Sequence, residues 1–194
     1  MPKVIKKTVY KFNELPENIQ DKVVEKLYDI NVDYEWWDMD GLLDLSENEM
    51  KERKISKREY GGLMFSYDHL YFDIERGRIW YIQFERLVVN NENVFRKWLR
   101  IPKRLWENVD YEFPSPTRNG ITTIEFSENY TYSDFTEKQQ QILDRAKEIF
   151  DDKIEEALNI LEKQYNYLTS REAIVETIEA NEYWFNENGD IERI

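Results

Sequence analysis

Apolar residues recur at every third or fourth position between about Thr136 and Leu168. Residues with this spacing share one face of an α-helix, so the pattern predicts a single long amphipathic helix. Its apolar face is predicted to consist of Ile142, Ala146, Ile149, Phe150, Ile154, Ala157, Leu158, Leu161, Tyr165 and Leu168. This helix is the longest element that the pattern predicts.

Shorter helices are predicted after Pro16, from Asp33 to Trp37 and on toward Met50, from Asn90-Asn91-Glu92, and after Thr169-Ser170-Arg171-Glu172. Proline suits the first turn of a helix, because the N–H that it lacks would have no partner there. A Ser or Thr followed three residues later by Glu can satisfy two free backbone N–H groups at a helix start. These signals favour helix starts near Pro16 and near Thr169.

Stretches of β-branched and aromatic residues predict strands at Lys3–Phe12, Leu70–Ile74, Ile79–Val89, Tyr111–Phe113, Ile121–Phe126 and around Asn188-Gly189. Glu75-Arg76-Gly77 is expected to turn the chain between the second and third of these, and Asn188-Gly189 suits a two-residue hairpin turn. Strands and helices therefore mix along the chain. We expect one α+β domain over residues 1–194, in which the long C-terminal helix and shorter helices pack on an antiparallel sheet.

Hydrophobic residues make up 41% of the 194 residues, which is enough to build a folded core. The chain has no Cys, so thiol nucleophiles, disulfides and thiolate metal sites are excluded, and a reducing cytoplasm is the expected setting. No apolar stretch approaches the roughly 20 residues that a membrane-spanning helix needs. The prediction is therefore a soluble protein of the cytoplasm that does not bind membranes.

The net charge of −13 is unevenly distributed along the chain. Residues 13–52 contain thirteen acidic and three basic side chains, and residues 132–194 contain sixteen acidic and seven basic ones. The stretch between them is almost neutral. Nucleic acid is a poor direct partner for such a surface, because phosphate binding requires Lys and Arg.

Carboxylates held on helices can imitate the spacing of backbone phosphates and bind the basic groove of a nucleic-acid-binding protein. We therefore predict a partner-binding surface in the two acidic segments. Its candidate residues are Asp33, Glu35, Asp38, Asp40, Asp44, Glu47, Asp144, Glu148, Asp151, Asp152, Glu155 and Glu156. The alternative is that these acids only keep a small protein in solution.

Candidate catalytic residues gather around the predicted central hairpin. His69 is the only histidine, and Asp73, Glu75 and Glu85 could supply paired carboxylates for acid–base or Mg²⁺ chemistry. The alternative for all four is an ordinary solvated or hydrogen-bonded role, because no nucleophile and no fixed separation can be identified. The sequence thus predicts no catalytic residue, with a small metal-dependent enzyme as the competing hypothesis.

The sequence around Asp38, Asp40, Gly41 and Asp44 resembles a calcium loop only faintly. With Gly41 at the sixth position, Trp36 would occupy the first, where a carboxylate is required. The six glycines have neither phosphate-loop nor dinucleotide-binding spacing. No metal or cofactor is therefore predicted.

Trp and Tyr are abundant, with six and thirteen residues respectively. These rings could stack on bases, but base stacking usually accompanies a basic groove, and the charge distribution does not supply one. Most of them are predicted to lie in the core and a minority on a protein interface. The basic cluster Arg53-Lys54-Lys57-Arg58 is predicted to be a solvated helix end.

Six segments carry a shared resemblance: Tyr10–Leu15, Ile30–Trp37, Tyr71–Gly77, Gln83-Phe84, Tyr165–Ile174, and Glu176–Tyr183 followed by Phe185 and a short Gly-containing tail. Together they resemble an uncharacterised family of bacteriophage proteins. Many members carry a Gly- and Ser-rich segment before the central strand, from which Gly61–His69 departs. The resemblance implies a phage protein in the host cytoplasm and supplies no catalytic residue.

These observations give three hypotheses from different classes. The first is a phage accessory protein that inhibits a host nucleic-acid-binding or defence protein of the CRISPR or restriction kind by acidic mimicry of DNA. The second is the metal-dependent enzyme. The third is a regulatory interaction protein similar to an antitoxin, which only the identity of its partner would separate from the first.

Overall fold

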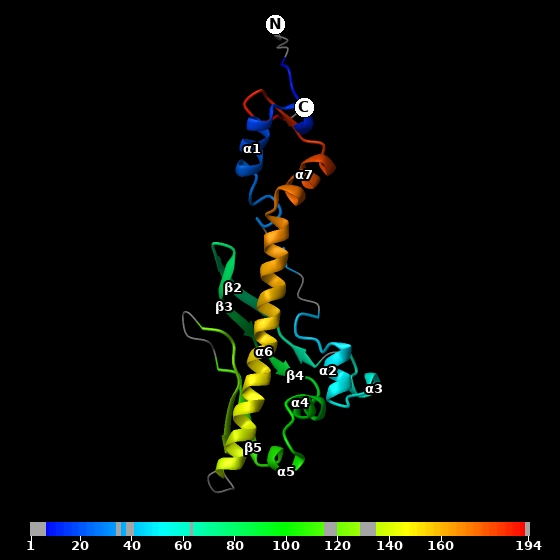
Figure 1. Cartoon of the computed structure of the whole chain (residues 1–194), viewed down its shortest axis with the longest axis vertical. Coiled ribbons are helices and arrows are strands. Elements are labelled where there is room, and N and C mark those ends of the chain that lie inside the picture. The colour runs from blue at the N-terminus through cyan, green and yellow to red at the C-terminus, as the bar shows by residue number, and fades with distance from the viewer. Residues whose placement is uncertain are drawn as a thin grey trace. The chain divides into compact units, whose positions relative to one another are not determined.

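The structure is a computed structural model (Figure 1). It describes residues 7–33, 36–37, 41–62, 64–114, 120–128 and 135–192. The chain divides into two compact units, unit 1 (Met1–Trp37 and Lys163–Ile194) and unit 2 (Asp38–Glu162). The boundary between Glu162 and Lys163 falls inside the long helix. The single domain expected from the sequence stays a prediction.

The described residues contain seven α-helices and one 3₁₀-helix. They are η1 (Phe12–Glu14), α1 (Glu17–Lys26), α2 (Glu47–Glu52), α3 (Lys57–Tyr60), α4 (Glu92–Trp98), α5 (Lys103–Trp106), α6 (Glu137–Leu168) and α7 (Arg171–Ala180). The predicted long helix is confirmed as α6. The predicted helix starts at Glu17 and after Asn91 are confirmed as those of α1 and α4.

Within the described ranges, four antiparallel two-stranded sheets accompany these helices. Their strands are β1 (Phe65–Ser66) with β4 (Val88–Val89), β2 (His69–Glu75) with β3 (Arg78–Glu85), β5 (Val109–Glu112) with β6 (Glu125–Glu128), and β7 (Trp184–Phe185) with β8 (Ile191–Glu192). The α+β class is therefore confirmed, with several small sheets in place of one larger sheet.

Unit 1 has its own hydrophobic core, formed by Phe12, Leu15, Val23, Ile174, Ile178 and Phe185. Helix α7 begins one residue later than the capping-box spacing suggests, because the Ser170 hydroxyl accepts the Ala173 N–H at 3.3 Å. The Thr169 hydroxyl instead donates to the Tyr165 carbonyl at 2.9 Å. The cap predicted at Thr169 is thus wrong by one position.

The strand predicted over Lys3–Phe12 is reduced to a single antiparallel bridge in the described residues. Tyr10 pairs with Phe185, their backbones exchanging hydrogen bonds of 2.8 and 2.9 Å. Lys3–Lys6 lies outside the described residues. The C-terminal hairpin is confirmed, but its turn is longer than two residues because the Asn186 side chain accepts the backbone N–H groups of Asn188 and Asp190.

The helix predicted from Asp33 toward Met50 is wrong for its described residues before Glu47. Trp36 and Trp37 are not helical, and α2 begins only at Glu47. Ser46 and Glu49 form a capping box there, since the Ser46 hydroxyl accepts the Glu49 N–H while the Glu49 carboxylate accepts the Ser46 N–H at 2.8 Å. This capping box therefore determines where α2 begins. The described apolar residues just before it do not form a helix.

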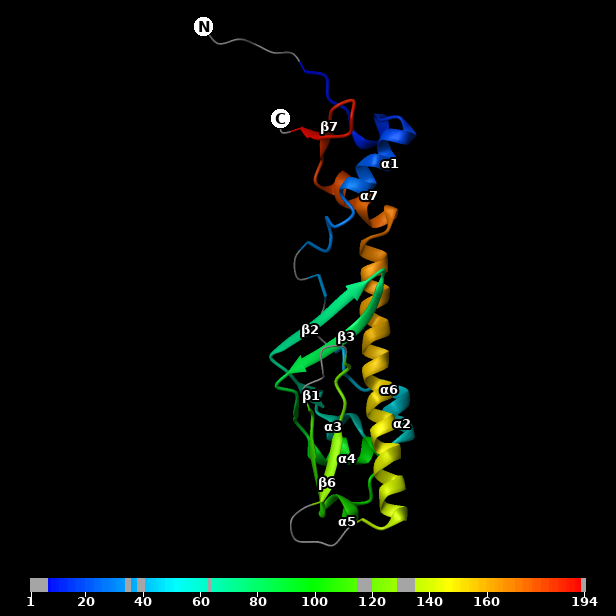
Figure 2. The ribbon, with the colours of Figure 1, turned by 90° about the vertical axis from the view of Figure 1, so that its left-hand side faces the viewer.

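In unit 2, α6 runs beside the β2–β3 hairpin, as both views show (Figures 1 and 2). The buried residues of α6 are Leu143, Ala146, Phe150, Lys153, Ile154, Ala157, Leu158 and Leu161. The predicted apolar face is confirmed in its centre, whereas Ile142 and Ile149 are only half-buried. Phe150 meets Phe65 and Phe113 at ring-centroid distances of 6.1 and 5.3 Å, which ties the helix to an aromatic cluster.

Lys153 is the one charged residue on the buried face of α6 within the described residues. Its side chain is 5% exposed, and its ammonium group lies 3.2 Å from Glu49 and 2.8 Å from Glu156. Burial tends to raise the pKa of Glu49, but its hydrogen bonds from Ser46 and the charge of Lys153 outweigh this and lower it. The ion pair therefore ties α2 to α6 inside the unit.

Gly189→Ala is expected to destabilise unit 1 by about 2 to 4 kcal/mol, because left-handed backbone strain and overpacking add. Gly189 has a φ of +83°, and a Cβ built on it would lie 2.8 Å from the Val23 Cγ2 atom. Amide hydrogen exchange in α1 measures the loss. Gly61→Ala is the control: φ is +71° there, nothing lies within 4 Å of the added Cβ, and a cost of about 1 kcal/mol is expected. Equal costs would contradict the contact with Val23.

Lys153→Met is expected to cost about 1 to 2 kcal/mol near neutral pH, because it leaves the Glu49 carboxylate partly buried without its cation. The folded-state pKa of Glu49 lies below its ordinary 4.5, so the stability that it contributes is present above that pH and is lost as the pH falls. Urea midpoints of the two proteins should thus differ most above about pH 5 and converge toward pH 3. A difference that is constant with pH would contradict this role.

Candidate functional site

Six carboxylates lie along one side of α6 within unit 2, and we call them the acidic stripe. They are Asp144, Glu148, Asp151, Asp152, Glu155 and Glu162. Steps of three, four and seven residues return a side chain to the same side of a helix, so these positions fall within about a third of its circumference. The stripe runs next to the buried face rather than opposite to it, because Asp151 and Leu158 are seven residues apart.

The stripe is mostly exposed and has no internal cation. Asp144, Glu148, Asp152 and Glu155 are exposed, whereas Asp151 and Glu162 are half-buried. In the part of the chain that the structure describes, none of the six forms an ion pair. Asp151 instead accepts the Thr123 hydroxyl at 2.8 Å, and Glu162 accepts the Ile79 N–H at 2.7 Å. The two half-buried carboxylates therefore receive their hydrogen bonds from neutral donors, which do not compensate their negative charge.

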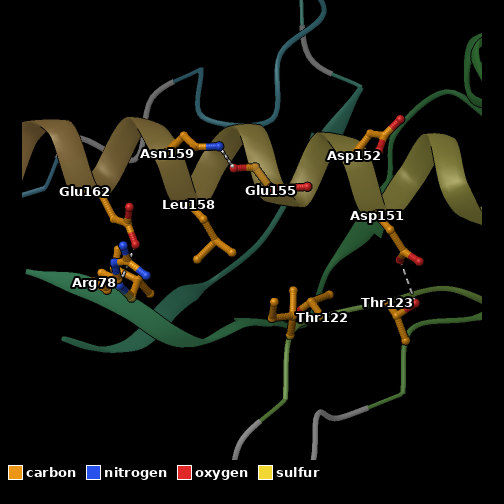
Figure 3. Close-up of a pocket in the computed structure, with 11 residues that line it drawn as sticks. Arg78, Thr122, Thr123, Asp151, Asp152, Glu155, Leu158, Asn159 and Glu162 are labelled. Atoms are coloured by element: carbon orange, nitrogen blue, oxygen red, sulfur yellow. Dashed lines mark hydrogen bonds between the residues drawn. The ribbon is translucent and has the colours of Figure 1, made fainter. Parts of the chain in front are cut away.

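A cavity of about 660 Å³ lies between α6 and the strand residues beside it (Figure 3). Asp151 and Glu162 project toward the strands in this view, with Leu158 between them, while Arg78, Thr122 and Thr123 approach from the other side. Its charged lining residues are Asp151, Asp152, Glu155, Glu162 and Arg78. The lining therefore contains four carboxylates and one guanidinium, so its net charge is negative.

The N-terminal end of the stripe has more cations around it. Asp144 and Glu148 line a second cavity of about 520 Å³ together with Arg100, Lys138 and Arg145. Charges of both signs partly cancel at this end. The unopposed negative charge is therefore concentrated between Asp151 and Glu162.

The first acidic segment behaves differently from the second. Asp33 is exposed and belongs to unit 1, and Glu35, Asp38 and Asp40 lie outside the described residues. Asp44 accepts a hydrogen bond from the Tyr60 hydroxyl at 2.8 Å. Burial, and to a smaller extent this hydrogen bond, raises the pKa of Tyr60 to about 12. Glu47 is paired with Lys57 at 2.5 Å, which lowers the pKa of Glu47.

Asp44 and Glu47 are thus occupied by partners within unit 2, and they are not part of the surface that we propose. Glu156, also predicted, is paired with buried Lys153. Of the described candidates, the structure brings five together on one surface: Asp144, Glu148, Asp151, Asp152 and Glu155.

Two charged residues that line the cavity of about 660 Å³ are not among the twelve candidates named individually from the sequence. Glu162 ends the helical segment on which the acidic face is predicted, and it lies seven residues after Glu155 on the same face. Arg78 reaches the same cavity from β3. No sequence signal connects Arg78 with α6, because strand pairing and packing bring them together.

The candidate catalytic residues share one face of the β2–β3 hairpin without converging. His69 and Glu85 are cross-strand partners, whereas Asp73 lies four residues further along β2, about 13 Å away. Glu85 accepts the Tyr71 hydroxyl at 3.0 Å, and this bond raises the pKa of Tyr71. Among the described residues, no three His, Cys, Asp or Glu side chains are placed to hold a metal ion.

None of the helices in the described part of the chain has the length and apolarity needed to cross a bilayer. Comparison of the chain with models of protein families, with curated proteins and with solved structures gave no match in any of the three. The resemblance to phage proteins thus remains a prediction from the sequence. The acidic stripe is the feature on which a function can be argued.

Asp152→Asn is expected to raise the stability of unit 2 by about 0.5 kcal/mol at low salt, because its helical neighbours Glu148, Glu155 and Glu156 all repel it. The gain should vanish at about 0.5 M salt, where the Debye length is only a few ångströms. Urea unfolding at the two salt concentrations measures it. Glu47→Gln, which removes an ion-paired carboxylate, should give no gain. A loss of stability in Asp152→Asn would show that a cation pairs with Asp152 in solution.

Proposed function

We propose that this protein binds the basic, nucleic-acid-binding surface of another protein through the acidic stripe on α6. The observation that carries the proposal is the row of carboxylates that remain without ion pairs in the described residues. Opposite charges speed the encounter between two surfaces and fix their register. A partner whose Lys and Arg normally contact phosphates is the kind of protein that this stripe fits.

The charge density of the stripe is close to that of a nucleic-acid strand. From Asp144 to Glu162 the helix rises about 27 Å. One strand of duplex DNA carries about eight phosphates over that length. Six carboxylates on one side of α6 therefore offer a basic groove a comparable number of negative charges.

The helix also holds these charges in place before binding. A disordered acidic tail would lose conformational entropy on association, whereas α6 is fixed by its buried face. The repulsion between neighbouring carboxylates costs the free protein some stability. Solubility alone requires only dispersed charges, which would avoid this repulsion. The clustered carboxylates are therefore better suited to binding a cationic partner.

The setting we propose is a phage infection. The sequence resemblance points to a phage accessory protein, and such proteins meet host nucleases and other DNA-binding defence proteins in the host cytoplasm. An inhibitor of the anti-CRISPR or anti-restriction kind that acts by mimicry of DNA would account for both the phage setting and the acidic stripe. The mode of action is stoichiometric binding and not catalysis.

The test compares three proteins as bait in bacterial lysate. The stripe variant carries Glu148→Gln, Asp152→Asn and Glu155→Gln. The control carries Glu25→Gln, Glu179→Gln and Glu187→Gln, three exposed acids of unit 1 without ion pairs in the described residues. Both variants change the net charge by the same amount, so only the location of the charge differs.

Wild type and control should retain the same DNA-binding proteins, and excess duplex DNA should displace them. Retention by the stripe variant should fall roughly tenfold or more, since three charged contacts are lost. Equal retention by all three proteins, or retention that duplex DNA does not affect, would overturn the proposal.

A further inference from the structure

The cavity beside the acidic stripe has an apolar floor. Leu158 of α6 and Ile79 of β3 line it and are only 8% and 7% exposed, and Ile121 lines it as well. Its volume of about 660 Å³ falls within the range of about 300 to 1,000 Å³ that is usual for binding pockets. The stripe therefore contains a place where a partner could insert a side chain, in addition to lying against the surface.

Leu158 lies between two carboxylates of the stripe. It follows Glu155 by three residues and precedes Glu162 by four, so the three side chains share one side of α6. These steps correspond to about 4.5 and 6 Å along the helix axis. A cationic group held above Leu158 would therefore have a carboxylate close to it on each side.

Two carboxylates of the cavity are oriented by hydrogen bonds from the chain itself. Asp151 accepts the Thr123 hydroxyl at 2.8 Å, as Figure 3 shows. Glu162 accepts the Ile79 N–H at 2.7 Å. A carboxylate has about four acceptor sites, so each of the two can accept further hydrogen bonds. Both are half-buried, and a charge attracts a cation more strongly where less water surrounds it. The cavity therefore presents oriented acceptors on both sides of Leu158 before a ligand binds.

An arginine side chain matches this combination better than other cations do. Its methylene stem can lie on the apolar floor while its charged end reaches the carboxylates. The guanidinium group has five N–H donors in one plane, and it is more weakly hydrated than the ammonium group of lysine. It can therefore donate to carboxylates on both sides of Leu158 and loses less hydration on entering the cavity. A metal ion fits less well, because no three His, Cys, Asp or Glu side chains of the described residues are placed to hold one.

We propose that this cavity receives one arginine side chain of the partner and that this contact anchors the complex. The inference rests on the proposed function, in which the stripe binds the basic surface of a nucleic-acid-binding protein. Arginine is common on such surfaces, because it contacts phosphates and bases, and it is frequent among the residues that dominate binding at interfaces. Glu155, Leu158 and Glu162 then determine specificity, whereas Glu148 contributes attraction at longer range.

Arg78 of β3 competes with the incoming side chain for the same carboxylates. It is the one cation among the described residues that line the cavity, and its own side chain is exposed. Removal of its charge should therefore tighten the binding of an arginine in the cavity. Arg76 provides a control with the same change in charge, since it is exposed in the turn of the same hairpin and does not line the cavity.

The test measures binding of N-acetyl-arginine methylamide to the whole chain by NMR titration, and N-acetyl-lysine methylamide is the comparison. The salt concentration is about 0.15 M, which screens exposed charges more than about 8 Å apart. The arginine probe should bind with a dissociation constant on the order of 1 mM and at least about fivefold more tightly than the lysine probe. The methyl signals of Leu158 and Ile79 should shift on binding, because these residues form the floor.

Glu162→Gln should weaken binding of the arginine probe about threefold or more, because a charged acceptor is lost while the side-chain oxygen can still accept the Ile79 N–H. Glu148→Gln is the matched control, since Glu148 belongs to the stripe but does not line this cavity, and it should have little effect. Arg78→Gln should tighten binding of the probe about threefold, and Arg76→Gln should leave it unchanged.

Equal binding of the two probes would overturn the inference, and so would equal effects of Glu162→Gln and Glu148→Gln. The comparison of the probes uses the unchanged chain, so it remains decisive where a variant fails to fold. Failure of the proposed function would appear differently, as equal retention of DNA-binding proteins from lysate by wild type and the stripe variant. A stripe that retains these proteins without preferring arginine would leave the proposed function standing and refute the arginine pocket alone.

Discussion

The burial of one face of α6 is the constraint on which unit 2 depends. Phe150 packs against Phe65 and Phe113, and this contact fixes how the helix is rotated about its axis. Once that rotation is fixed, the helical repeat decides where every other side chain of α6 lies. The carboxylates of the stripe form a row because they share the period of the apolar residues. The core and the charged surface are therefore two consequences of one spacing.

The two acidic segments differ in how their candidate carboxylates are partnered inside the protein. Glu49 is bound by Lys153, Glu47 by Lys57, and Asp44 by the Tyr60 hydroxyl, so the first segment stabilises the packing of α2 and α3. The second segment lies on a helix whose buried cation is already used by Glu49 and Glu156. Both segments have a strongly negative net charge along the sequence. Whether their carboxylates are available to a binding partner depends on the residues that folding brings next to them.

Strongly periodic elements could be predicted from the sequence, and elements defined by distant contacts could not. Helix α6 and the β2–β3 hairpin are confirmed, because many apolar positions or a clear turn at Gly77 specify each of them. In the described part of the predicted Lys3–Phe12 strand, only Tyr10 pairs, and its partner Phe185 is distant in the sequence. Burial of Lys153 has no local signal, since a lysine on an apolar face becomes predictable only when Glu49 is known to approach it. For the site, the spacing identified five stripe carboxylates but not the Thr123 hydroxyl that donates to Asp151, nor the presence of Arg78 in the same cavity.

Charge alone provides a broad kind of recognition. A row of carboxylates attracts many cationic grooves, because electrostatic attraction is long-ranged and tolerant of register. The packed helix restricts this choice, since it fixes the spacing of the carboxylates over about 27 Å before a partner binds. In the proposed function, selectivity among basic proteins would come from the match between this spacing and the cations of the groove, which net charge alone cannot supply.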